Sequence, residues 1–130
     1  MTTPKYADKP IEKWTVNDML SYVADKHAEL YGVEYVPYRS WSAERGLLGN
    51  LIGTRTKPRK YSPAVVKRFV DECFASHRVS PQYPGVSFGW FWTYKKTVWQ
   101  RVVAEEQRKA QRKEAVAKSD ADWDELADWL

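Results

Sequence analysis

The stretch that decides the fold is SFGWFWTYKKTVWQRVVAEEQRKAQRKEAVAK, residues 87–118. Its first half, from Phe88 to Val103, is rich in aromatic side chains and contains no acid, whereas its second half, from Glu105 to Lys118, is almost entirely charged or small. This pattern predicts one long helix, which packs on a core through its first half and projects into water through its second. The sequence therefore predicts a helix that links a basic, aromatic body to the acidic end of the chain.

Capping signals and apolar faces predict three further helices before this stretch, at residues 15–31, 42–53 and 62–77, the second from the face of Leu47, Leu48, Leu51 and Ile52. The first begins with Thr15, followed three residues later by Asp18, as in a capping box, and it ends at Gly32. The third begins with Ser62 and Pro63, which are favoured at the N-cap and the first helical position. We therefore expect an all-α fold, namely a four-helix globular body with a long C-terminal helix and an acidic-aromatic tail.

Composition divides the chain into four segments. Residues 1–13 contain two prolines and alternating charges, so we expect a flexible N-terminal arm. Residues 14–104 are expected to form the helical basic and aromatic domain, and residues 105–118 a charged helical extension. Residues 119–130, SDADWDELADWL, combine five acids with tryptophan and leucine, and this acidic tail is predicted to bind a partner groove.

Length and cysteine content indicate an intracellular binding domain that folds without disulfide or metal cross-links. A chain of 130 residues suits one domain with a modest core. Its single cysteine, Cys73, allows no disulfide within the chain, which fits a reducing cytoplasm. We expect no membrane partner, because no apolar run approaches the ~20 residues of a membrane span and the first ten residues lack a signal-peptide core.

The net charge of +4 conceals a segregation along the chain. Residues 45–104 carry eleven basic and two acidic side chains, whereas residues 1–44 and 105–130 are both net acidic. Such asymmetry indicates a polyanionic partner or a polar contact within the molecule.

The basic centre predicts contact with nucleic acid, with DNA as the expected partner, because lysine and arginine neutralise phosphates and release counterions. Aromatic rings are interleaved with these bases and could stack on unpaired bases, although we expect most of them in the core. The gap between the second and third helices is too long for a helix-turn-helix, so the loop and the start of the last helix are the better candidates. The predicted nucleic-acid-binding residues are Arg55, Lys57, Arg59, Lys60, Lys95, Lys96 and Arg101.

Catalytic chemistry and metal binding are not predicted. Zinc needs about four ligands, whereas the chain offers only Cys73, His77 and His27 and no CxxC pair. The string GNLIGTRTK lacks the Gly-Lys pair of a phosphate-binding P-loop, and no GxSxG motif occurs. We therefore expect a protein that is not an enzyme, with no cofactor and no metal.

The pattern from Trp14 to Trp99 resembles a small helical domain of tailed-phage replication accessory proteins. The resemblance lies in a YGxxYxP-like turn, a Gly-Leu-rich helix, a Tyr-Ser-Pro-opened helix and an aromatic Gly-Phe-Trp-Phe segment. It implies a role in DNA replication within the cytoplasm of a bacterial host cell.

The acidic tail resembles the C-terminal motifs by which phage polymerases and late-transcription factors bind the sliding clamp. Asp128, Trp129 and Leu130 match that motif in type, while Ala127 stands where leucine is expected. The resemblance implies a protein partner such as a sliding clamp, polymerase or helicase component. The predicted partner-binding residues are Trp123, Leu126, Asp128, Trp129 and Leu130.

These observations predict a non-enzymatic phage-type accessory protein of DNA replication or transcription, with a nucleic-acid-binding face and a protein-binding tail. The alternative is a transcription co-activator or sigma-like regulator that binds RNA polymerase without direct DNA binding. A third interpretation has the acidic tail fold back and mask the basic body.

Overall fold

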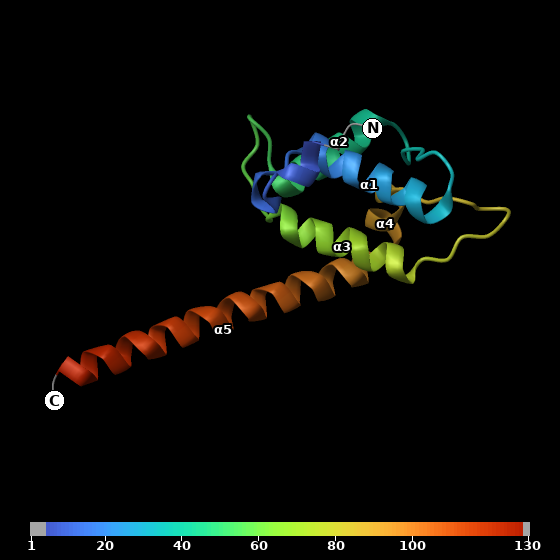
Figure 1. Ribbon diagram of the computed structural model, residues 1–130. Coiled ribbons are helices and arrows are strands. Elements are labelled where there is room, and N and C mark those ends of the chain that lie inside the picture. Colours follow the sequence, from blue (N-terminus) through green and yellow to red (C-terminus); the bar gives the residue numbers. More distant parts are fainter. Residues whose placement is uncertain (1–4, 129–130) are drawn as a thin grey trace.

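The computed structural model describes the backbone of residues 5–128 and the side chains of residues 6–118, and all the regular secondary structure of that part is helical (Figure 1). Two short 3-10 helices come first and five α-helices follow. They are η1 (Lys5–Asp8), η2 (Ile11–Lys13), α1 (Val16–Tyr31), α2 (Trp41–Ile52), α3 (Pro63–Ser76), α4 (Phe88–Tyr94) and α5 (Lys96–Asp128). The predicted all-α class and the long C-terminal helix are confirmed.

The first and third predicted helices form for the reasons that their caps indicated, whereas the N-cap of α2 is Ser40, two residues before the predicted start near Ser42. The Thr15 side chain accepts a hydrogen bond from Asp18 N, and the Asp18 carboxylate accepts one from Thr15 N, which completes the capping box of α1. Ser62 caps α3, and Pro63 occupies its first turn. Each boundary lies within one residue of its prediction, because local hydrogen bonds at helix ends are encoded by neighbouring residues.

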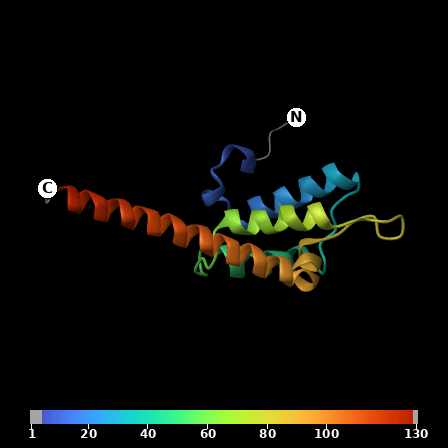
Figure 2. The same ribbon diagram turned by 90° about the horizontal axis from the view of Figure 1, so that it is seen from below.

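The predicted fourth helix is in fact two helices. Lys95, with φ −117° and ψ 35°, leaves the helical path and separates α4 from α5. Phe88 and Phe91 of α4 are fully buried, and Trp99 and Val102 bury a second apolar face at the start of α5. The chain turns at Lys95 because α4 packs against both α2 and α3, whereas α5 runs mainly along α3 (Figure 2).

The helix α3 lies between α1 and α5 in both views (Figures 1 and 2). Edge-to-face aromatic contacts fill the core around it, with Phe69 against Trp99 at 5.4 Å and Phe74 against Phe91 at 5.0 Å between ring centroids. Arg68 forms ion pairs with Glu105 and with Glu106, the latter at 2.9 Å. These contacts end near Glu106, and from Gln107 to Lys118 the side chains of α5 are exposed.

The residues predicted to form a flexible arm are folded onto the body where the structure describes them. The Tyr6 ring packs against Trp14 at 5.1 Å and donates a hydrogen bond to Asp25 at 2.5 Å, while Lys9 pairs with Asp18 at 2.9 Å. Pro10, which favoured an arm, instead precedes the short helix η2 as its N-cap. Aromatic packing between residues that are not sequence neighbours sets the conformation of this region, and a local sequence pattern does not predict such contacts.

A buried carboxylate joins α2 to the start of α4. Glu44 is fully buried, and its two oxygens accept hydrogen bonds from Tyr35 Oη at 2.5 and 2.9 Å and from Gly89 N at 2.9 Å. Tyr35 Oη in turn accepts a bond from Phe88 N at 2.8 Å. Burial raises the pKa of Glu44, against the lowering effect of these hydrogen bonds. Side chains from distant segments thus satisfy the first amides of α4.

Candidate nucleic-acid interface

A cleft of about 480 Å³ lies where the start of α1 meets the loop between α2 and α3. Because no acidic residue lines it and four basic residues do, we call it the cationic cleft. Its basic residues are Lys13, Arg55, Lys57 and Arg59. Lys13 comes from η2, before α1, and the sequence analysis did not include it.

The loop that carries three of these cations is tied down by its own backbone. Thr54 N donates to Lys57 O at 3.0 Å, and Lys60 N and Tyr61 N both donate to Leu51 O, at 3.1 and 2.8 Å. Gly53 has φ +84°, and a Cβ atom there would stand 2.8 Å from Arg59 N. The loop therefore closes tightly over the end of α2, and it needs glycine at that position.

Arg59 has a structural partner on each side of the cleft. Its Nε donates to Ile52 O at 2.9 Å and its Nη1 donates to Glu12 O at 3.1 Å. The guanidinium thereby satisfies a carbonyl at the C-terminus of α2, where a positive charge is favourable, and joins that helix to η2. Arg59 shapes the cleft and contributes its charge there.

The remaining cleft cations have no carboxylate partner among the described residues. Lys57 donates to the amide oxygen of Asn50 at 2.9 Å, and Arg45 reaches Asn17, another lining residue, at 3.3 Å. Neutral partners leave the positive charges uncompensated, so the cleft has an attractive field for anions.

The nearest buried acid does not neutralise the cleft. Asp18 is engaged by Thr15 and by Lys9 Nζ at 2.9 Å. Burial works to raise the pKa of Asp18, but these hydrogen bonds and the Lys9 charge together lower it. The N-terminal turn of α1, with Val16 and Asn17, lines the same cleft and adds the positive end of a helix dipole.

The seven predicted nucleic-acid-binding residues do not form one continuous face. Arg55, Lys57 and Arg59 line the cationic cleft, and Lys60 is the exposed residue that follows them. Lys95 and Lys96 lie at the α4–α5 junction, where their ammonium groups stand 5.9 Å and 3.3 Å from the ring centroids of Trp90 and Trp92. The turn at Lys95 places these two lysines away from the bases of the cationic cleft.

Arg101, the seventh, forms ion pairs within the protein. Its Nη1 is 3.0 Å from Glu72 and 3.4 Å from Glu105. Hydrogen bonding and the charge of Glu72 raise the pKa of Arg101, so it stays cationic while its charge is locally balanced. A role in nucleic-acid binding stays a prediction for all seven residues, and Arg101 has the least free charge.

The projecting part of α5 carries bases that the sequence analysis treated as a spacer. The basic loop and the projecting end of α5 lie toward the same end of the body in both views (Figures 1 and 2). Over residues 107–118 the exposed helix has five bases and one acid. The bases are Arg108, Lys109, Arg112, Lys113 and Lys118. Their four-residue spacing places pairs on common faces, which was readable in the repeated QRK string.

The aromatic residues among the bases divide between core and surface. Trp99 is buried, and Tyr61 packs edge-to-face against it at 4.9 Å, as expected for core rings. Tyr83 and Tyr94 are instead exposed. Neither of these two lines the cationic cleft, and the tryptophan that does, Trp14, is buried, so the cleft itself is a charge site without an exposed stacking platform.

The described residues contain no group of three or more metal-binding side chains. Cys73 is buried on α3, and burial raises the pKa of its thiol to about 12, which keeps it protonated at neutral pH. Over the same part of the chain, no helix combines the length and apolar character that crossing a membrane requires.

The predicted partner-binding residues fall at the limit of the structure. Trp123, Leu126 and Asp128 belong to α5, but their side chains lie outside those described, and Trp129 and Leu130 lie outside the described residues altogether. The helical backbone does continue to Asp128, beyond the predicted end at Lys118.

Comparisons with known proteins add no relative. No family model matches the chain, and neither the search of curated proteins nor the search of solved structures found a match. The resemblance to phage replication domains therefore stays a prediction.

Proposed function

We propose that this chain is a non-enzymatic nucleic-acid-binding accessory protein that contacts the phosphate backbone through the cationic cleft. One observation carries the proposal: four basic residues, without a carboxylate partner among the described residues, surround a cleft that no acid lines. Backbone hydrogen bonds hold their loop, so little conformational entropy is lost on binding. The exposed bases of α5 add positive charge toward the same end of the body as the cleft.

The proposal includes a setting in phage-type DNA replication or transcription and a protein partner for the acidic tail. The phage-type setting and the sliding clamp as partner come from the sequence resemblance. The length of α5 supports a role in presenting the tail to a partner, because 33 residues at ~1.5 Å each extend for ~50 Å and only the first turns pack on the body.

The test is a salt-dependent binding titration with fluorescent DNA and RNA probes, both duplex and single-stranded. Four phosphate contacts predict that log K falls with log salt at a slope of about −3 to −4. The double charge reversal Arg55→Glu, Lys57→Glu is expected to weaken binding by roughly 100-fold and to flatten that slope by about 2.

The matched control reverses two other exposed arginines, Arg39→Glu and Arg78→Glu, which do not line the cleft. This variant has the same net charge as the first and should keep most of the affinity. Equal loss in both variants would mean that only net charge matters, and no loss in the first would overturn the proposal.

A further inference from the structure

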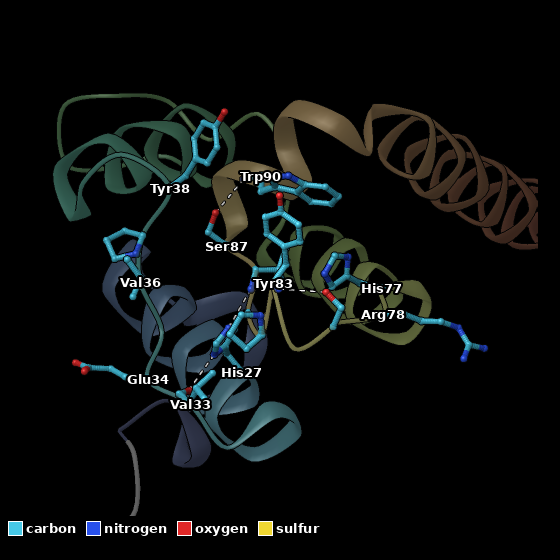
Figure 3. Close-up of a pocket in the computed structure, with 15 residues that line it drawn as sticks. His27, Val33, Glu34, Val36, Tyr38, His77, Arg78, Tyr83, Ser87 and Trp90 are labelled. Carbon is cyan, nitrogen blue, oxygen red and sulfur yellow. Dashed lines mark hydrogen bonds between the residues drawn. The ribbon is translucent and has the colours of Figure 1, made fainter.

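A second and larger cavity, of about 720 Å³, lies between the α1–α2 and α3–α4 connections (Figure 3). Its walls are mainly apolar and aromatic, so we call it the aromatic pocket. The principal residues around it are Val36, Tyr38, His77, Tyr83, Val86 and Trp90. Its volume falls in the range of ~300–1,000 Å³ that is typical of ligand sites.

The two connections that form the aromatic pocket are joined by one buried imidazole. Val86 N donates to His27 Nε2 at 3.1 Å, so Nε2 must be unprotonated and Nδ1 carries the proton that bonds Val33 O at 3.2 Å. Gly85 lies so close that a Cβ atom there would stand 2.7 Å from His27 Nε2. His27 thus holds the two connections in place through these two hydrogen bonds, and we call this arrangement the His27 clamp.

Large apolar side chains are exposed around the aromatic pocket. Among the described residues, four of the nine exposed large hydrophobic side chains line it, including Val36 at 70% exposure and Tyr83 at 68%. The other two are Val33 and Tyr38. A cluster of exposed apolar groups on a small protein marks an interaction surface.

The charges at the aromatic pocket lie on its rim. Glu34 and Arg78 line it, but their charged groups point away from it in opposite directions (Figure 3). Lys95 stands over the Trp90 ring at 5.9 Å, so two cations, Arg78 and Lys95, face one acid, Glu34, around the pocket. The interior therefore suits apolar side chains, while this excess of positive charge at the rim favours an acidic ligand.

We infer that the aromatic pocket binds the acidic tail, residues 119–130, of a second copy of this chain. The tail supplies Trp123, Leu126, Trp129 and Leu130 for an apolar pocket, and its five acids with no base complement the basic rim. This inference rests on the second part of the proposed function, since it names the protein that receives the tail. It does not depend on nucleic-acid binding.

The same chain cannot fill its own aromatic pocket in this conformation. The helix α5 is continuous from Lys96 to Asp128 and projects from one end of the body, whereas the 77–87 connection that borders the pocket extends from the other (Figures 1 and 2). Contact in trans joins two different surfaces, so it produces either a reciprocal pair or a growing chain of copies.

The experiment is sedimentation velocity on the full chain without nucleic acid, over roughly 1 to 100 µM, the range that resolves micromolar association. The weight-average mass of the native chain should rise with concentration. It should stay at the monomer value for the tail variant Trp123→Ala, Trp129→Ala and for the pocket variant Val36→Asp, Tyr83→Ala. Both pocket positions are so exposed that the fold should tolerate the changes.

Val116→Asp is the matched control for the pocket variant, because Val116 is a similarly exposed valine, at 61%, on the projecting part of α5. This variant should associate like the native chain. A pocket variant that associates normally would overturn the inference.

Mixing separates binding in trans from all other arrangements. The tail variant still has an intact pocket and the pocket variant an intact tail, so an equimolar mixture should form dimers although neither variant does so alone. A native chain that stays monomeric throughout would overturn the inference. If, in that case, removal of residues 119–130 abolished capture by a sliding clamp, the proposed function would stand although this inference had failed. The DNA titration tests nucleic-acid binding separately.

Discussion

The cationic cleft and the aromatic pocket lie at opposite ends of the same small body and are built in opposite ways. The loop side of the cleft is held by local hydrogen bonds, from Thr54 N to Lys57 O within the loop and from Lys60 N and Tyr61 N to Leu51 O of α2. The pocket is formed by two connections far apart in the chain, which are linked by the hydrogen bonds of His27, while Tyr35 and Glu44 bond to the first amides of α4. The cleft should therefore depend on local conformation and the pocket on buried polar groups.

The largest expected effect is at the pocket end. Glu44→Ala leaves Gly89 N and the hydroxyl of Tyr35 buried with fewer partners, and it should lower the free energy of unfolding by about 3 kcal/mol. Chemical denaturation followed by tryptophan fluorescence measures this loss. Glu114→Ala, at an exposed helical site, is the control and should change stability by less than about 0.5 kcal/mol. A similar small change for Glu44→Ala would show that the buried network is dispensable.

The next effect belongs to the cleft end. Gly53→Ala places a Cβ atom against the backbone of Arg59 at a φ of +84°, which should cost about 2 kcal/mol and displace the cationic loop. Nucleic-acid affinity should then fall together with stability. Gly46→Ala is the control, since no atom lies within 4 Å of its Cβ position and α2 should gain up to about 1 kcal/mol. If Gly53→Ala kept native affinity, the loop would not need its closed form to bind.

The smallest expected effect is a dependence of stability on pH, which arises at the pocket end and distinguishes it from the cleft end. Burial lowers the pKa of His27 below its usual 6.5, despite the opposing hydrogen bond to Val33 O. The unfolded chain therefore binds a proton more readily, so stability should be full above about pH 6.5 and should fall as the pH drops through the folded pKa. Burial and Lys95 lower the pKa of His77 as well, which gives the same sign.

Thermal unfolding between pH 7.5 and 5 checks this dependence. His27→Gln should flatten the slope more than His77→Gln, because protonation of His27 also breaks the bond from Val86 N. If the cleft end is independent of this clamp, the salt slope of nucleic-acid binding should be the same in His27→Gln and the native chain. Equal slopes of stability against pH in both histidine variants would contradict the assigned role of the clamp.

The candidate sites were predictable from the sequence to different degrees. The basic string from Arg55 to Lys60 was visible because its residues are adjacent, and the structure brings three of them into one cleft. Lys13 was missed, since η2 reaches the cleft only through tertiary contacts, including the bond from Arg59 to Glu12 O. The aromatic pocket was missed for the same reason, as Tyr38 on one wall and His77 on the other are 39 residues apart.

By itself the sequence determined where α1, α2 and α3 begin and end, because caps such as Thr15 and Ser62 bond to residues three positions away. It also determined the segregation of charge. Only the tertiary structure decided that the long aromatic helix breaks at Lys95, that the first residues fold back through Tyr6, and that Glu44 is buried. The physical reason is common to all three: each follows from packing between residues distant in the chain, which local spacing does not record.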